Sequence, residues 1–335
     1  EVRCMNTNIL VSSKEQRPKK ESRFIIGTHD GTFHSDEVVA CAILALLHSN
    51  KKVEIVRSKD ISFLKAKHPH IMVDIGGGTY DHHQPGGNGE RENGNPYASA
   101  GLVWRNYGLR LVSKCFLELY NSPSPDIVEL VFKDIDENLI QEVDKEDNGI
   151  PTYIHYFSFI SSFLPVYHTK YNNFDEGFQL ALNVSIEILK HEIYETISKR
   201  VTSKTICDLI SSKGILPCGI LEIPSQTLSW LEPVCIYNLD IGCNLSSTPV
   251  NFVIYPYPSG GWAAQCVPPS IGYKFEQRIP FPEEWAGQTE KLPEISGVKD
   301  STFCHNGRFF VRARTRKGVI DLCSKAFSCH TQHSS

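Results

Sequence analysis

Histidine and carboxylate side chains gather between residues 28 and 37 of this 335-residue chain. The segment holds His29, His34 and Asp36, with further acidic residues among them. Imidazole and carboxylate groups are ligands that Mn, Fe, Zn and related ions take in proteins. Acidic residues also stabilise the first turn of a helix without any metal. The segment therefore indicates either a metal site or an ordinary helix start.

A second group lies at the end of the apolar run 71–75 and just beyond it. Asp74 ends this run, where a buried carboxylate is costly unless it is paired or bound to metal. Asp81, His82 and His83 follow. One of two adjacent rings can bind metal and the other can donate to a substrate oxygen, while the aspartate orients a ring. A solvated polar turn is the alternative interpretation.

A third acidic segment covers residues 142–147. On its own, such a charged helix end is typical of a solvated face. Acids three residues apart share one face of a helix, so one of them could turn inward. Asp144 and Asp147 are the two candidates for a ligand from this helix.

The apolar pattern of the first half predicts the elements that position these groups. Short apolar runs predict strands, and helical spacing with start and stop residues predicts helices. The expected strands are 24–27, 53–56 and 71–75, and the expected helices are 36–47, 99–119, 126–143 and 175–199. This order is typical of a parallel sheet, in which functional groups gather at the carboxyl ends of strands.

The second half has a different texture from about residue 217. Runs rich in Val, Ile and Tyr at 234–237, 250–255 and 262–267 alternate with turns, and the last two are expected to form a hairpin. Residues 308–317 hold five Lys or Arg side chains. Arg312, Arg314 and Arg316 would point one way along a strand and could grip phosphates. An exposed strand protected by basic residues is the alternative.

Composition limits the classes of partner. The net charge is -4, so a nucleic acid would have to be held by local positive charge. The 11 scattered cysteines indicate reduced thiols of an intracellular protein. The longest apolar run, 38–47, is about half of a membrane span. No membrane partner is expected, and the oligomeric state is not indicated.

Together these motifs resemble the MYG-type exonuclease family of the DHH phosphoesterase superfamily. The resemblance covers about residues 23–325. The matching segments are 27–37, 73–77, 80–84, 99–102, 142–150, 252–255, 265–268 and 278–285. His34 stands where much of the superfamily has Asp, as in the MYG-type branch. Residues 311–313 read Val-Arg-Ala where family members commonly carry Gly-Gly-His for substrate phosphate.

The resemblance implies an α/β fold, with a DHH-type parallel sheet flanked by helices and a smaller mixed α/β domain. The expected layout is a tail at 1–21, the metal domain at 22–175, connecting helices at 176–216, a substrate-binding domain at 217–327 and a tail at 328–335. It also implies two divalent cations, Mn²⁺ or alternatively Mg²⁺, that activate water for attack on phosphorus. The implied metal ligands are His29, His34, Asp36, Asp74, His82 and Asp144, and Asp147 remains the alternative to Asp144. His83 would touch the substrate phosphate with Asp81 beside it. Substrate binding would fall to His305, Arg312, Arg314 and Arg316.

Three functional hypotheses follow. The first is a 3′–5′ exonuclease acting on RNA or single-stranded nucleic acid. The second is a phosphoesterase acting on pyrophosphate or a short nucleotide. The third is an RNA- or metal-binding adaptor with weak turnover, which the altered 311–313 segment keeps open. The resemblance implies a place in the nucleus or mitochondrion, and the cytoplasm is the alternative.

Overall fold

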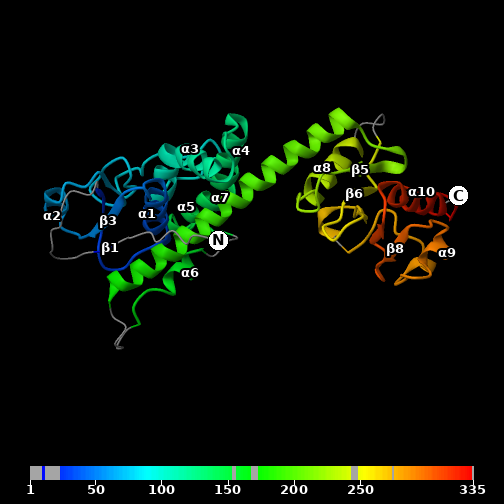
Figure 1. Ribbon diagram of the computed structural model, residues 1–335. Helices are drawn as coiled ribbons and strands as arrows, with labels where there is room; N and C mark the ends of the chain where they lie inside the picture. Colours follow the sequence, from blue (N-terminus) through cyan, green and yellow to red (C-terminus); the bar gives the residue numbers. More distant parts are fainter. Residues whose placement is uncertain are drawn as a thin grey trace. The chain divides into compact units, whose positions relative to one another are not determined.

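The computed structural model describes residues 10–11, 23–152, 156–166, 173–242, 248–273 and 275–333. The chain divides into two compact units, Glu1–Ser198 and Lys199–Ser335 (Figure 1). The division falls within helix α7 (Phe174–Lys213), inside the segment predicted to connect the domains. Among the described helices, none combines the length and the apolar character needed to cross a bilayer.

A four-stranded parallel sheet forms the centre of the first unit, in the order β1-β3-β2-β4. Its strands are β1 (Leu10–Val11), β2 (Arg23–Thr28), β3 (Lys52–Arg57) and β4 (Ile71–Met72). The predicted parallel sheet is confirmed. Strand β1 belongs to the segment predicted as a polar tail, and the rest of that tail lies outside the described residues.

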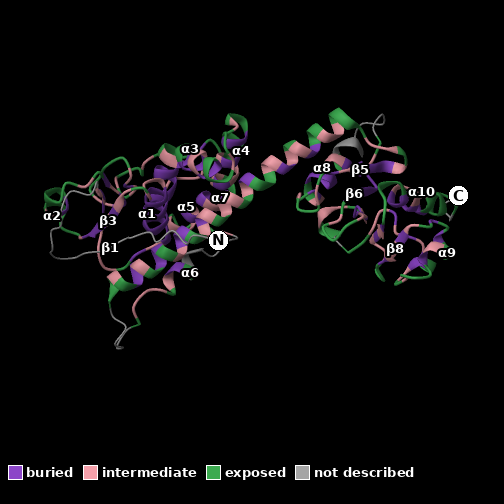
Figure 2. Cartoon of the chain, in the orientation of Figure 1, coloured by how far each residue is buried: buried purple, intermediate pink, exposed green. Residues whose placement is uncertain are grey.

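Helices flank this sheet. They are α1 (Ser35–Leu47), α2 (Ile61–Ala66), α3 (Ser99–Leu119), α4 (Pro125–Ile135), the π-helix η1 (Asp136–Ile140), α5 (Gln141–Asp147), α6 (Tyr156–Ser161) and α7. Helix α1 is buried along nearly its whole length and packs against α3 (Figure 2). This burial explains why apolar residues lie on nearly all its sides.

The predicted helix 126–143 is interrupted by the π turn of η1. Such wide turns commonly mark functional sites. Here η1 begins with Asp136, which receives two bonds from the guanidinium of Arg91, at 2.9 and 2.8 Å. Asn93 and Asn95 both donate to Oε1 of Gln141, at 2.9 Å. The Gly- and Asn-rich segment after the Asp-His-His motif is thereby fixed to the start of α5.

The second unit is built on a five-stranded mixed sheet in the order β5-β6-β7-β9-β8. The strands are β5 (Ile220–Glu222), β6 (Phe252–Pro256), β7 (Trp262–Cys266), β8 (Ser301–Cys304) and β9 (Phe310–Ala313). The helical elements are η2 (Pro217–Gly219), α8 (Leu231–Gly242), η3 (Ile271–Tyr273), η4 (Glu283–Trp285), α9 (Leu292–Ser296) and α10 (Arg316–His333).

Both faces of this sheet are covered, because successive side chains of β6 pack alternately into two different cores. Phe252 and Ile254 pack in one core together with residues of α10. Val253 and Tyr255 pack in another core with residues of α8 and with Ile206 of α7. The mixed α/β domain and its β6–β7 hairpin are therefore confirmed.

Three expectations for this unit need correction. Residues 234–237 belong to helix α8, because Val234, Cys235 and Asn238 bury one helical face. The predicted tail from 328 continues α10 as far as His333, and 334–335 lie outside the described residues.

The arginine stripe is the third correction, because β9 ends at Ala313 and α10 starts at Arg316. Thr315 causes this break: its Oγ1 accepts the Gly318 N–H at 3.0 Å, which caps the helix.

Candidate metal centre

The carboxyl ends of the parallel strands bring the first group of ligands together. His29 follows β2, and its Nε2 lies 3.2 Å from Oδ2 of Asp74 and 3.2 Å from Oε1 of Glu37. Asp74 follows β4 with φ at 57°, a left-handed conformation that non-glycine residues rarely adopt outside functional sites. The backbone N–H of Asp74 donates to the Tyr80 carbonyl at 2.8 Å, which holds this turn.

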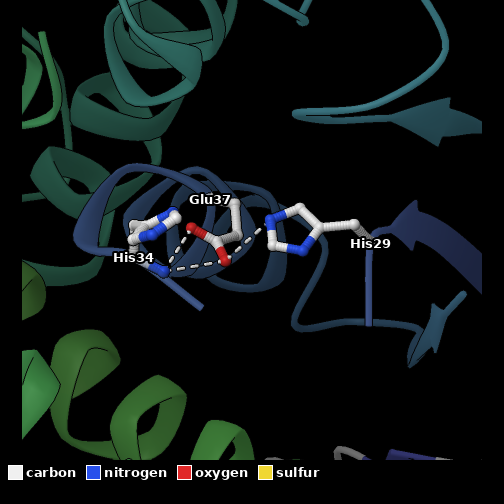
Figure 3. Close-up of side chains that lie close together, drawn as sticks. All are labelled: His29, His34 and Glu37. Atoms are coloured by element: carbon white, nitrogen blue, oxygen red, sulfur yellow. Dashed lines mark hydrogen bonds and ion pairs between the residues drawn. The ribbon is translucent and has the colours of Figure 1, made fainter. Parts of the chain in front are cut away.

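Helix α1 supplies two buried carboxylates from its first turn. Glu37 accepts the His34 N–H at 2.9 Å with both oxygens, which closes the helix start. Its carboxylate lies between His34 and His29 (Figure 3). Asp36 is fully buried, and its Oδ2 accepts the Ser99 N–H at 3.2 Å. The start of α1 thus also supplies two of the candidate ligands, Asp36 and Glu37.

Ser99, the first residue of α3, joins two of these carboxylates. Its hydroxyl donates to Oδ1 of Asp74 at 3.0 Å while its N–H donates to Asp36. The sequence reasoning did not name Ser99 as a site residue. Its signals in the sequence are a small polar residue at the start of a long helix and a place in the family-matching segment 99–102.

His82 is the point where three carboxylates meet. Its Nε2 lies 3.0 Å from Oδ2 of Asp147, 3.3 Å from Oδ1 of Asp74 and 3.6 Å from Oδ2 of Asp36. Among the described residues, Nε2 of His82 and Oδ1 of Asp36 are nevertheless buried without a hydrogen-bond partner. Buried polar atoms in such a position are expected to have another partner, such as an ion.

Within the described part of the chain, four overlapping groups of three side chains could each hold a cation. In each group the ligand atoms lie within 4.8 Å of one another. Together the groups contain His29, His34, Asp36, Glu37, Asp74, His82, His83 and Asp147. This is more ligand than one ion needs, and the mixture of carboxylate and imidazole fits divalent transition metals.

The charges in this centre are strongly coupled. Burial and the neighbouring carboxylates Asp74 and Asp147 raise the pKa of Asp36 well above its ordinary value. Burial also opposes charge on Asp74, but the hydrogen bond to His29 and the nearby imidazoles of His82 and His83 prevail and hold its pKa well below the ordinary value. Burial lowers the pKa of His82, yet the carboxylates of Asp147 and Asp74 beside its Nε2 raise it to about 10. The carboxylates of this centre are therefore stabilised by nearby positive charge, from protonated imidazoles or from a bound cation.

Asp81 and His83 lie at the edge of the centre. Oδ1 of Asp81 lies 3.2 Å from Nδ1 of His83, and Oδ2 accepts the Gly77 N–H at 2.7 Å. The His83 side chain is 59% exposed, and its Nδ1 also lies 3.2 Å from Asp74. Asp81 therefore orients His83, whose ring is open to a ligand from solvent.

Asp144 is not brought into the centre. Its Oδ2 accepts Nη1–H of Arg91 at 2.8 Å, and its Oδ1 accepts the Gly101 N–H at 2.9 Å. Burial raises the pKa of Asp144 to about 7, although Arg91 lowers it. Asp147, the last residue of α5, lies beside His82 and belongs with His34 and Asp36 to one of the groups that could hold an ion.

Arg57 fixes the loop that carries His29. Its guanidinium donates to the carbonyls of His29 and Gly31, at 3.1 and 2.9 Å. It also pairs with Asp175 of α7 at 2.8 Å and lies 4.4 Å from the ring centroid of Phe178. Arg57 is the last residue of β3, and its burial, which the sequence did not reveal, gives it this role.

The predicted substrate residues of the second unit lie in different settings. Arg312 stacks on the Tyr257 ring at 4.0 Å and donates to Ser259 Oγ at 3.1 Å. Arg312 and Arg314 line a cavity of ≈ 430 Å³. Arg316 lies outside this cavity lining and pairs with Glu222, with Nε donating at 2.9 Å.

His305 lies apart from this cavity lining, in the turn that follows β8. It is exposed, its Nδ1 accepts the Gly307 N–H at 2.9 Å, and its ring packs on Phe309 with centroids 4.5 Å apart.

Comparison with known proteins gives a family. A family model described as "Uncharacterised protein family (UPF0160)", named for the MYG1 exonuclease, matches residues 25–327. The MYG1 exonuclease of Bos taurus is 31% identical over 89% of this chain and 83% of its own. That of Rattus norvegicus is 30% identical over 96% of this chain and 91% of its own.

Solved structures give a much weaker likeness. RecJ from Thermus thermophilus, in complex with Mn²⁺, matches 92% of this chain and 52% of its own at 12% identity. The TM-score of 0.24 is too low to bear on the fold or the site. The match to the family model and the identity with the MYG1 relatives show that this chain belongs to the MYG1 exonuclease family.

Proposed function

We propose that this protein is a metal-dependent 3′–5′ exonuclease that acts on RNA or single-stranded nucleic acid. The observation that carries the proposal is the convergence of three carboxylates on Nε2 of His82, a buried atom without a hydrogen-bond partner among the described residues. The relatives are named exonucleases, and the same activity is proposed for this chain.

Two divalent cations would be held by the overlapping ligand groups. Asp36 and Asp74 lie centrally, since each is close to ligands of more than one group. His29, His34, Glu37, His82 and Asp147 would complete the set. A pair of divalent ions lowers the pKa of water and neutralises charge on phosphate oxygens. Mn²⁺ is the proposed ion, because it accepts both oxygen and imidazole ligands, with Mg²⁺ as the alternative.

The protein's own groups have separate tasks. Arg57 and Ser99 hold the His29 loop and two carboxylates in fixed positions. His83 faces solvent beside Asp74 and would donate to a phosphate oxygen of the substrate. Asp81 keeps its ring in place by the 3.2 Å contact. Such fixed donors act without reorganisation during the reaction, which is how enzymes stabilise developing charge.

In the second unit, Arg312 and Arg314 would bind substrate phosphate. They line one cavity together with Phe303, whose ring offers a surface for a base. Nε of Arg312 is buried without a hydrogen-bond partner among the described residues. His305 would assist at the nearby turn. A role for Arg316 would require release of Glu222.

The test is hydrolysis of a 3′-labelled or 5′-labelled single-stranded RNA in Mn²⁺, Mg²⁺ or chelator, with pyrophosphate as a competing substrate. Stepwise, metal-dependent shortening from the 3′ end is the expected result, and Asp74→Asn should abolish it. Release of phosphate from pyrophosphate alone would instead establish a small-molecule phosphoesterase. RNA binding without turnover of either substrate would establish an adaptor. Localisation of the tagged protein would test its proposed place in the nucleus or mitochondrion.

A further inference from the structure

A second cavity of the first unit lies against edge strand β4 and is separate from the ligands of the metal centre. Its volume is ≈ 680 Å³. The end of α2, strand β4, the turn 78–80 and helix α3 contribute to its walls. The side chains with chemistry in this lining are Lys65, His68, His70, Thr79, Tyr80 and Tyr107. Because β4 forms the edge of the sheet, no further strand covers this side among the described residues.

The lining combines aromatic rings with positive charge. Tyr80 and Tyr107 lie with ring centroids 5.9 Å apart, and the Tyr80 hydroxyl donates to the Tyr107 hydroxyl at 3.4 Å. Asn106 donates to the same Tyr80 oxygen at 3.1 Å, which fixes the pair. Lys65 is exposed at the cavity, and no Asp or Glu belongs to its described lining.

Cations also surround the cavity. The guanidinium of Arg110 lies 5.9 Å from the ring centroid of Tyr107. The pKa of His48 is lowered to about 4 by burial and then by Lys51, Arg110 and Lys114. Lys65 in the lining and Arg110 beside Tyr107 therefore give this cavity positive charge that favours anions.

The cavity shares one backbone segment with the metal centre. Asp74 and Asp81 turn their carboxylates to the centre, whereas Gly78, Thr79 and Tyr80 between them form cavity wall. The bonds from Asp74 N–H to Tyr80 and from Asp81 N–H to Gly78 close this segment into a compact turn. A polymer held in the cavity would thus be separated from the carboxylates of Asp74 and Asp81 by this turn alone.

We propose that this cavity binds a nucleotide of the single-stranded substrate outside the scissile bond, with a base on Tyr107 and a phosphate on Lys65. The proposal rests on the proposed function and adds a second contact for the polymer. Aromatic rings beside a positively charged groove are how proteins hold single strands without reading their sequence. Short substrates would not reach this cavity, so its contribution should depend on substrate length.

The first test compares kcat/KM for a dinucleotide and a dodecanucleotide RNA. Tyr107→Ala should lower kcat/KM for the longer RNA about tenfold and leave the dinucleotide unchanged. Tyr107→Phe keeps the ring and should behave as wild type. Tyr120→Ala, which removes a partly buried tyrosine just beyond α3, is the matched control. An equal effect of Tyr107→Ala on both substrates, or none on the longer one, would overturn the proposal.

The second test measures binding of the longer RNA in the Asp74→Asn background over a range of salt concentrations. Lys65→Ala should reduce the slope of log affinity against log salt by about 0.7, the contribution of one phosphate contact on a single strand. Lys67→Ala removes an exposed lysine that lies over Phe63 and should leave the slope unchanged. An unchanged slope in Lys65→Ala would contradict the proposal. If wild type cleaves no RNA of either length, the proposed function fails, while this binding result still decides whether the cavity holds a nucleotide.

Discussion

Nε2 of His82 lies 3.0 Å from Oδ2 of Asp147, so the Asp-His-His segment meets the last residue of α5. Asp144 lies one helical turn earlier and points elsewhere, with its two oxygens occupied by Arg91 and by the Gly101 N–H. The two aspartates on one helix therefore have different tasks: Asp147 faces the metal centre, and Asp144 joins α5 to α3 and to Arg91.

The pair Asp147→Asn and Asp144→Asn separates these tasks. Asp147→Asn should weaken Mn²⁺ binding about 100-fold, because a ligand should matter at least as much as the groups that orient ligands. Asp144→Asn should leave Mn²⁺ affinity near that of wild type but lower the free energy of unfolding by about 3 kcal/mol, since Arg91 loses its buried partner. Calorimetric titration and denaturant unfolding check both. The reverse pattern would restore Asp144 as the ligand.

Glu37 combines a helix cap with a ligand position, and two substitutions distinguish them. Glu37→Gln keeps an oxygen that can accept the His34 N–H, so its unfolding free energy should stay within about 1 kcal/mol of wild type. It loses the negative charge, so Mn²⁺ affinity should fall about tenfold or more. Glu37→Ala should lose both. If Glu37→Gln binds Mn²⁺ like wild type, then Glu37 is a cap alone.

Arg57 should matter through its shape rather than its charge. In Arg57→Lys a single ammonium cannot donate to His29, Gly31 and Asp175 together and cannot stack as a guanidinium does. The expected loss is about 3 kcal/mol of unfolding free energy, together with about tenfold in Mn²⁺ affinity. Arg105→Lys changes an exposed arginine that stacks on Tyr97 and serves as the control. Unchanged Mn²⁺ affinity in Arg57→Lys would show that the His29 loop holds its shape without this residue.

His48 should make stability depend on pH in the acidic range. Its pKa is lowered from 6.5 to about 4 by burial and by the nearby cations, first among them Lys51. Between about pH 4 and pH 6.5 the unfolded chain therefore binds more protons at His48 than the folded chain does. The contribution of His48 to the free energy of unfolding is fully present above about pH 6.5 and is lost as pH falls toward 4. Between about pH 7.5 and about pH 5, His48→Phe should lose less Tm than wild type. His191→Asn, on the exposed face of α7, should follow wild type, and an identical loss in His48→Phe would contradict the assignment.

The sequence was most informative where one local signal determined the structure. Helix 99–119 was predicted with both ends correct, because its apolar pattern is long. The family resemblance implied His29, His34, Asp36, Asp74 and His82 as ligands, and the structure brings them together in overlapping groups. Their role as ligands stays a prediction.

Other features depended on partners far away in the chain. Asp144 and Asp147 share one helical face, and only Arg91, 53 residues before Asp144, draws one of them aside. Glu37 looked like an ordinary acid of a helix start. Residues 234–237 have a strand-like composition, yet burial of one face of α8 against the sheet makes them helical. Contacts between residues far apart in the chain cannot be predicted from the local pattern of apolar and polar residues.

The number of Mn²⁺ ions bound per chain tests the central claim most directly. Mass spectrometry of metal content after equilibration with Mn²⁺ should give about two ions for wild type, the number that overlapping ligand groups around Asp36 and Asp74 would hold. Asp74→Asn, which lies within both the His82 and Asp36 groups, should reduce this number toward zero while the protein stays folded. Wild-type protein that binds no Mn²⁺, or an Asp74→Asn variant that keeps both ions, would contradict the account.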